Sequence, residues 1–283
     1  MGFRSKSVTA APGNRKVVGL IRVCHIKAMT AATLAASPIR KAAAGEARLH
    51  QQAYDRLCEA LMQGEFQPGQ QLTFRTLAEA LGVSVTPIRE AVTTLATLGA
   101  LHVHPKRFIE VPHISAEAYL EMLDQRRLLE GHAAARAAER ISDSEIDQLI
   151  GINEGLMRQA FDGRHRDAMR ENQRFHFAVY RAARSRYLLE DIERLWLLIG
   201  PSLNVHLAEE YSRERAVLIS GFENHTRLIE ALKARDPGDA LKAIIGDMSV
   251  SCSHMLTGLL RDSRLSVNVV AELNGISRLT ASG

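Results

Sequence analysis

The sequence has little of what marks a secreted, membrane-spanning or disulfide-rich protein. It contains three cysteines, Cys24, Cys58 and Cys252, which lie far apart and are odd in number. This usage excludes a disulfide framework or a cysteine-rich metal site, and it fits a reducing cytoplasm. We find no apolar run of about 18 residues, so no membrane span is expected.

Aromatic residues are also scarce, at 5% of the chain, whereas Ala, Leu and Arg are abundant and favour helix. The hydrophobic content of 46% is ordinary for a soluble globular protein. At 283 residues the chain is long enough for two domains. The composition therefore predicts a soluble, mainly α protein.

The net charge of +4 is unevenly distributed along the chain. Residues 1–49 carry nine Lys and Arg residues against one acid, whereas residues 50–112 carry five basic and six acidic residues. The basic excess therefore lies in the N-terminal segment. Nucleic-acid binding by the rest of the chain would depend on a few well-placed cations rather than on bulk charge.

The most informative stretch is residues 72–91, which has the pattern of two short helices joined by a tight turn. The turn lies at Leu81-Gly82-Val83, and the second helix begins after Ser84, a good N-cap. This arrangement is typical of a helix-turn-helix, in which the N-terminal residues of the second helix enter the major groove of DNA.

The flanking residues indicate a winged form of this motif. Residues 50–64 show a helical stripe of apolar side chains. Residues 102–104 and 108–111 alternate as a short β-hairpin around Pro105-Lys106-Arg107. Three helices followed by a small hairpin predict a winged helix-turn-helix over residues 48–112.

The order of these parts resembles the GntR family of bacterial transcription regulators. The matching segments are Gly64–Leu72, Arg75–Ser84 and Thr86–Ala91. The resemblance implies that Arg75 and Arg89 contact DNA, since a guanidinium grips guanine or phosphate bidentately. It also implies that the hydroxyls of Ser84 and Thr86 bond phosphate or base edges. A solvated role for Arg89 and pure capping by Ser84 are the alternatives.

Two positions depart from the family pattern. Val85 stands where the family usually has a base-reading arginine, and valine can only touch a thymine methyl group. The hairpin usually has a glycine near its tip, whereas here Lys106-Arg107 leads straight into Phe108. We predict DNA contacts from Val85, Lys106 and Arg107, and an operator that selects guanine less strongly at one position.

Residues 1–47 lack sustained periodicity and are rich in Ala, Ser, Thr and basic residues. We interpret them as a disordered basic tail. One interpretation is an inert segment or an over-extended gene start, since Met29 offers a later one. Another is an accessory arm that strengthens non-specific DNA binding. A targeting peptide is the third, although a compact apolar core and a clean cleavage site are lacking.

From Ser115 onward the pattern is helical and shows no strand signal, which predicts an all-α bundle over residues 115–262. Ser142 and Asp236 also read as helix caps, and Gly200-Pro201 should kink or break the fourth helix. Residues 263–283 form a tail without a matched motif. The expected helices lie near residues 115–140, 143–161, 164–183, 186–210, 213–234 and 237–261.

This bundle resembles the FCD ligand-binding domain of the FadR subgroup. The matching segments are Arg126–Glu130 with the alanines that follow, Asn172–His176 and Glu223–His225. Many such domains bind a divalent metal through one carboxylate and three histidines. The resemblance implies the corresponding metal ligands Asn172, His176, His225 and Asp247.

The implied ligand set is altered, since the usual carboxylate is the amide Asn172 and the usual last histidine is Asp247. Such a set still suits Zn, Mn, Ni or Fe, with weaker binding and open positions for water or an effector carboxylate. A metal-free effector pocket and packing histidines are the alternatives. Arg126 matches a family arginine near the pocket, where a guanidinium is able to grip an acidic effector bidentately; the alternative is a surface salt bridge with Glu130.

These features predict a cytoplasmic transcription regulator, interpreted as a repressor. It acts as a homodimer on a palindromic double-stranded DNA operator, and a small organic acid effector releases it. The rival from another class is a metal-dependent hydrolase or lyase in the bundle, which lacks a convincing general base. A further alternative is an architectural DNA binder whose bundle only dimerises.

Overall fold

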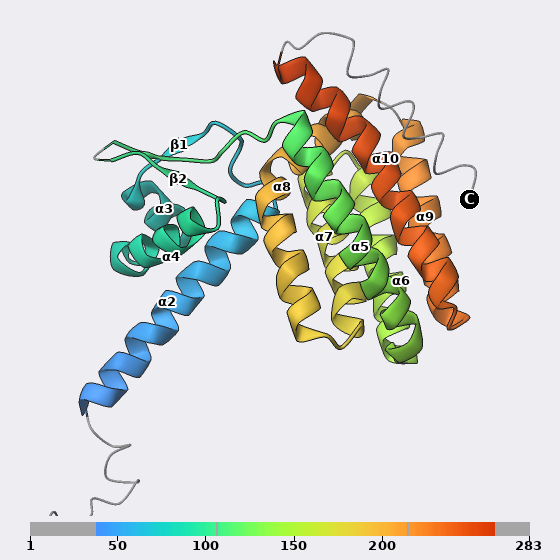
Figure 1. Ribbon diagram of the computed structural model, residues 1–283, viewed down its shortest axis with the longest axis horizontal. Helices are drawn as coiled ribbons and strands as arrows, with labels where there is room; N and C mark the ends of the chain where they lie inside the picture. The colour runs from blue at the N-terminus through green and yellow to red at the C-terminus, as the bar shows by residue number, and fades with distance from the viewer. Residues whose placement is uncertain (1–37, 106, 214, 264–283) are drawn as a thin grey trace, which may run out of the picture. The chain divides into compact units, whose positions relative to one another are not determined.

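The computed structural model describes residues 38–105, 107–213 and 215–263. The chain divides into two units, Met1–Gly45 and Glu46–Gly283, and the contacts described below lie within the second. The described residues form helices α2 to α10 and a small three-stranded antiparallel sheet (Figure 1). This confirms the predicted class, a mainly α protein with a winged helix-turn-helix and an all-α bundle.

Helix α2 runs from Pro38 to Met62 and begins earlier than predicted. The tail was expected to be disordered to residue 47, whereas residues 38–47 are helical. Proline suits the first turn of a helix, and the alanines that follow have the highest helix propensity, although they give no amphipathic pattern. The prediction for residues 1–37 lies outside the described residues.

Helices α3, Phe74–Leu81, and α4, Val85–Thr97, form the helix-turn-helix. The Thr73 side chain caps α3 by accepting a hydrogen bond from the Thr76 N–H at 3.1 Å. Gly82 ends α3 with a φ of 64°, a left-handed conformation that glycine adopts without steric cost. The predicted tight turn at this glycine is therefore confirmed.

The predicted hairpin is present as strands β2, His102–Val103, and β3, Ile109–Glu110, which pair antiparallel with Val103 opposite Ile109. A further strand, β1, Gln71–Leu72, pairs with the other edge of β3. The sequence did not predict β1, because two residues are too few to show the alternation of a strand.

Six helices form the bundle, and their ends agree with the predicted ones to within three residues. Ser115 caps the first of them by accepting a hydrogen bond from Ala118 N–H at 3.1 Å. Ser142 and Glu145 form a reciprocal capping box at the start of the second. The helices are α5, Ala116–Arg140; α6, Asp143–Phe161; α7, His165–Ala182; α8, Arg186–Arg213; α9, Arg215–Lys233; and α10, Pro237–Ser263.

Within the described chain, α10 alone is long and apolar enough to cross a membrane, with a mean hydropathy of 1.2 over Pro237–Leu260. Half of this apolar segment is buried, and α10 packs along α5 and α9 (Figure 1). These are the features of a core helix in a helical bundle.

A kink or a break was predicted at Gly200-Pro201; a break is wrong, because α8 continues through Pro201. A proline inside a helix costs about 3 kcal/mol. Here the residues before it are buried on two sides: Leu197 joins the core of the winged module, and Ile199 joins the core of the bundle. Tertiary packing on both sides outweighs the local preference of the proline.

The end of α2 contacts the middle of α8 at unusually close range. The side-chain amide of Asn204 donates hydrogen bonds to the main-chain oxygens of Met62 and Gly200, each at 2.8 Å. A Cβ added at Gly200 would lie 2.7 Å from the Met62 Cα, and one added at Gly64 would lie 2.3 Å from the Asn204 Cβ. Only glycine allows this approach. We call Met62, Gly64, Gly200 and Asn204 the α2–α8 junction.

Candidate functional site

The residues predicted to contact DNA lie on α3, at the start of α4 and in the β2–β3 hairpin. All of those that the structure describes are exposed to solvent, and Lys106 lies outside the described residues. The exposed residues are Arg75, Ser84, Val85, Thr86, Arg89 and Arg107.

The two arginines of the helix-turn-helix differ in their surroundings. Arg75 Nε lies 2.9 Å from Glu79 Oε1 in a solvent-exposed pair, which holds the side chain only weakly. The Arg89 guanidinium lies 4.4 Å from the centre of the Phe74 ring, in a cation–π contact. Arg89 is therefore exposed yet positioned by the first residue of α3.

Ser84 occupies the N-cap position of α4 with extended backbone, at φ −77° and ψ 160°. Within the described chain its side chain makes no capping hydrogen bond. The capping bond that the sequence offered as an alternative is therefore not formed, and the hydroxyl is free for another acceptor or donor. Val85 follows as the first residue of α4 and is 36% exposed.

The hairpin lacks the usual glycine and is held by side chains instead. His104 Nε2 lies 2.6 Å from Glu110 Oε2 across β2 and β3. The His104 ring packs between His102 and Phe108, with ring centres 4.5 Å and 4.3 Å away. This packing fixes the base of the hairpin, from which the exposed Arg107 projects.

In the bundle, three of the four predicted metal ligands come together. His176 on α7, His225 on α9 and Asp247 on α10 are buried, and their ligand atoms all lie within 4.8 Å of one another. His176 Nε2 is 3.3 Å from one Asp247 oxygen, and His225 Nε2 is 3.6 Å from the other. Residues far apart in the sequence thus converge on one point.

The hydrogen bond to Asn153 fixes the tautomer of His225. His225 Nδ1 lies 3.0 Å from the Asn153 side-chain oxygen, which only accepts, so Nδ1 carries the proton. His225 Nε2 is then an unprotonated acceptor. It is buried and has no hydrogen-bond partner among the described residues. A buried imidazole with its far nitrogen anchored in this way is typical of a metal ligand.

A hydrogen bond also places the proton of His176 on Nδ1. The Tyr180 hydroxyl donates to Glu130 Oε2 at 2.5 Å, so its oxygen accepts from His176 Nδ1 at 3.2 Å. In the neutral ring, His176 Nε2 therefore also presents a lone pair toward Asp247. Two imidazole lone pairs and a carboxylate facing one another fit a divalent metal, because these are ligands that Zn, Mn, Ni and Fe accept.

The buried environment sets the protonation states that such a set needs. Burial lowers the pKa of His225 to about 4, although the Asp247 charge opposes this shift. Burial alone would raise the pKa of Asp247, but the His225 and His176 rings and Arg126 together hold it below its ordinary value. At neutral pH the imidazole of His225 is neutral and the carboxylate is ionised, as metal binding requires.

Asn172, the fourth predicted ligand, is buried on α7. It lies one helical turn before His176, and so on the same face of the helix. Its side chain offers a neutral amide oxygen in place of the carboxylate that this position usually supplies.

Comparisons with known proteins agree with both parts of this description. The model of the "Bacterial regulatory proteins, gntR family" matches residues 49–111, and that of the FCD domain matches residues 121–248. The HTH-type transcriptional regulator McbR of Escherichia coli K12 is 34% identical over 173 residues, which are 61% of this chain and 77% of McbR. The chain belongs to the GntR family.

A solved structure and a further relative are also similar to this GntR regulator. The solved structure of E. coli McbR/YncC superposes with a TM-score of 0.66 at 29% identity, over 76% of this chain and 98% of that one. A probable D-xylose utilization operon transcriptional repressor of Paenarthrobacter nicotinovorans is 30% identical over 186 residues, 66% of this chain and 79% of its own. The chain is therefore a DNA-binding transcription regulator with an FCD domain, and not an enzyme.

The GntR regulator also contains a buried ion pair beside the metal-ligand cluster. Arg126 is 3% exposed, and its Nε donates to Glu130 Oε1 at 2.5 Å. The pair that the sequence offered as an alternative for Arg126 is thus present, but it is buried rather than at the surface. Glu130 also accepts from the Trp196 indole at 3.1 Å and from the Tyr180 hydroxyl.

These contacts join into one buried polar chain to which all six bundle helices contribute. It connects the metal-ligand cluster with α8 through Trp196. Asn153, Tyr180 and Trp196 were not predicted as site residues from the sequence, although Tyr180 follows His176 at the same one-turn spacing that separates Asn172 from His176. In order, this buried polar chain consists of Asn153, His225, Asp247, His176, Tyr180 and Glu130, with Arg126 and Trp196 hydrogen-bonded to Glu130.

Proposed function

We propose that this GntR regulator is a cytoplasmic homodimeric repressor of a palindromic operator, released by a small organic acid. In this proposal residues 48–112 read DNA, and residues 115–262 bind the effector and dimerise. The exposed first turn of α4 supports the first role, because this turn enters the major groove in helix-turn-helix proteins. A single winged module reads one half-site, so a palindrome needs two copies.

The proposed DNA contacts divide by chemistry. The arginines grip guanine edges or phosphates, and the hydroxyls of Ser84 and Thr86 bond phosphates or base edges. Val85 offers only an apolar contact to a thymine methyl group. The full set is Arg75, Ser84, Val85, Thr86, Arg89, Lys106 and Arg107.

We further propose that His176, His225 and Asp247 hold a divalent metal, with Asn172 beside them. The observation that carries this proposal is the buried His225 Nε2, which has no hydrogen-bond partner among the described residues and faces a carboxylate. A metal bound there would supply Lewis-acid positions for an effector carboxylate. Asn153 and Tyr180 keep the two imidazoles in the metal-binding tautomer.

Arg126 is proposed to supply the positive charge that favours an acidic effector. An effector carboxylate near Arg126 competes with Glu130 for the guanidinium, and Glu130 also holds Trp196 of α8. A change in the position of Glu130 therefore alters its hydrogen bond to Trp196 of α8. Helix α8 in turn contacts the winged module at the α2–α8 junction. The effector acts only to the extent that it binds the DNA-bound and released states differently.

The experiment is elemental mass spectrometry of the purified protein, with His176→Ala/His225→Ala as the test variant. We expect about one equivalent of metal in the wild type, as in other buried sites of this kind, and loss in the variant. His132→Ala, an exposed histidine of α5, is the matched control and should retain the metal. Absence of metal from the wild type after supplementation with Zn, Mn, Ni and Fe salts contradicts the metal site and favours a metal-free effector pocket.

A further inference from the structure

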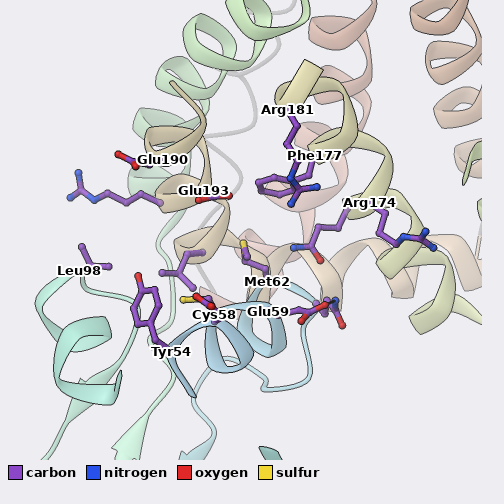
Figure 2. A pocket seen from close by; sticks show the side chains of 15 residues that line it. Tyr54, Cys58, Glu59, Met62, Leu98, Arg174, Phe177, Arg181, Glu190 and Glu193 are labelled. Atoms are coloured by element: carbon purple, nitrogen blue, oxygen red, sulfur yellow. Dashed lines mark hydrogen bonds between the residues drawn. The ribbon is translucent and has the colours of Figure 1, made fainter. Parts of the chain in front are cut away.

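A cavity of about 680 Å³ lies between α2 and the helices α7 and α8. Its volume falls within the range of about 300–1,000 Å³ that is usual for small-molecule sites. Among the described residues, its lining includes none of the four proposed metal ligands. Figure 2 shows Tyr54 and Cys58 of α2 at its lower edge, Arg174 and Phe177 of α7 on the right, and Glu193 of α8 on the left.

The cavity and the metal-ligand cluster use different faces of α7. Gln173 and Phe177 line the cavity, and each follows a residue of the proposed ligand set, Asn172 or His176, by one position. Successive residues of a helix point in different directions, so an occupant of the cavity does not meet the metal ligands. The cavity is therefore a separate site.

Much of the cavity wall is apolar. Phe177 is only 3% exposed, and it packs edge-on against Trp196 with ring centres 5.4 Å apart. A rigid buried aromatic wall of this kind favours a ligand with an apolar or aromatic body. The apolar and aromatic lining residues are Tyr54, Met62, Leu98, Phe177 and Leu197.

One charged group of the wall, Glu193, has no hydrogen-bond or ion-pair partner among the described residues. The carboxylate of Glu193 is half-buried, and within the described ranges it accepts no hydrogen bond and forms no ion pair. Burial raises its pKa; Arg181 opposes this shift, and the carboxylates of Glu190 and Asp55 add to it. A desolvated carboxylate near two others is stabilised by a cation.

Two of the three arginines that line the cavity are already engaged. Arg174 forms an ion pair with Glu171 at 2.6 Å. The Arg181 guanidinium lies 5.5 Å from the centre of the Phe177 ring. The third, Arg194, is exposed to solvent. In the less exposed part of the wall, the charge without an ion-pair partner among the described residues is therefore the negative charge of Glu193.

We propose that this cavity binds an organic monocation with an apolar or aromatic body. The positive charge lies beside Glu193, and the body packs against Phe177, Tyr54 and Met62. The walls come from α2 and the end of α4 on one side and from α7 and α8 on the other. The occupant thus contacts both the winged module and the FCD bundle, so independently of the metal it changes operator affinity to the extent that it binds the DNA-bound and released states differently.

Tetraphenylphosphonium and tetraphenylborate are suitable probes, because they share one apolar body and carry opposite charges. Isothermal titration calorimetry of the full chain should show saturable binding of tetraphenylphosphonium and none of tetraphenylborate. Glu193→Gln keeps the shape and removes the charge, and we expect an affinity loss of about tenfold. Glu193→Asp should retain most of the affinity. Glu154→Gln, an exposed carboxylate of α6, is the matched control and should behave as the wild type.

Equal binding of both probes, or unchanged affinity in Glu193→Gln, overturns the proposal. Thermal melting of the variants checks that their folding is intact. Titration in the presence of EDTA separates this site from the metal site, since tetraphenylphosphonium affinity should not change. A loss of binding in EDTA contradicts the independence of the cavity, whereas failure of the metal proposal leaves the expected result unaltered.

Discussion

The side-chain amide of Asn204 donates to the main-chain oxygen of Met62 at 2.8 Å, and so joins the middle of α8 to the end of α2. The same helix sends Trp196 to Glu130 and Leu197 into the core of the winged module. Helix α8 therefore contacts both the buried polar chain and the DNA-reading part. In the proposed function, α8 is the route by which occupancy of the bundle alters operator binding.

The first prediction concerns the α2–α8 junction. Asn204→Ala removes both donated hydrogen bonds and leaves the Met62 oxygen without this donor, so we expect a destabilisation of about 1–3 kcal/mol in urea unfolding. If occupancy of the metal site changes operator affinity through α8, we also expect this change to be smaller in Asn204→Ala. Gln148→Ala removes an exposed amide from α6 and should change neither quantity. If the metal changed operator affinity in Asn204→Ala as much as in the wild type, the coupling between bundle and winged module would not pass through the α2–α8 junction.

The second prediction concerns pH and the metal-free protein. The pKa of His225 is lowered from 6.5 to about 4 in the folded state, so protons bind the unfolded chain more readily in this range. Stability is therefore complete above pH 6.5 and falls as the pH decreases toward 4, by up to about 3 kcal/mol. Urea unfolding at pH 7 and pH 4.5 in EDTA measures this difference.

The control for this pH dependence is His225→Gln, which lacks the titrating ring. The variant should be less stable at pH 7 but should lose less stability between the two pH values. An equal loss in both proteins would show that other groups cause the acid sensitivity.

The third prediction concerns operator choice. Val85→Arg restores a bidentate donor at an exposed position in the first turn of α4. We expect a new guanine preference at one operator position, because a good arginine–guanine pair contributes about 1–3 kcal/mol of discrimination. Selection from a randomised DNA pool measures the preference. Thr97→Arg adds the same charge at the end of α4, and it should raise affinity without changing the selected sequence.

The fourth prediction concerns Phe74, which positions Arg89. An exposed cation–π contact contributes about 0.5–1 kcal/mol. We therefore expect Phe74→Leu to weaken operator binding by about two- to fivefold, and Phe74→Tyr to retain it. Fluorescence anisotropy over a range of salt concentrations should give the same salt slope for all three proteins, since no phosphate contact is lost. Equal weakening by both variants would indicate a packing role instead.

Most of the secondary structure was determined by the sequence itself. Capping residues such as Ser115 and Ser142, apolar periodicity and the glycine at position 82 act within a few residues. Their effects therefore survive in almost any tertiary context. The winged module and the positions of His176, His225 and Asp247 were implied by the resemblance to the GntR family and its FCD domain. The roles proposed for these residues rest on that resemblance together with the packing that brings the three ligands to one point.

Other features were decided only by the tertiary structure. Strand β1 exists because β3 offers it an edge, and α8 continues through Pro201 because packing on two sides outweighs the local cost of a proline. Arg126 and Glu130 could be paired from their spacing, but their burial depends on the helices around them. The Glu193 carboxylate, which has no hydrogen-bond or ion-pair partner among the described residues, and its cavity arise where α2, α7 and α8 meet. Periodicity along one helix carries no information about which side chains of other helices it will face.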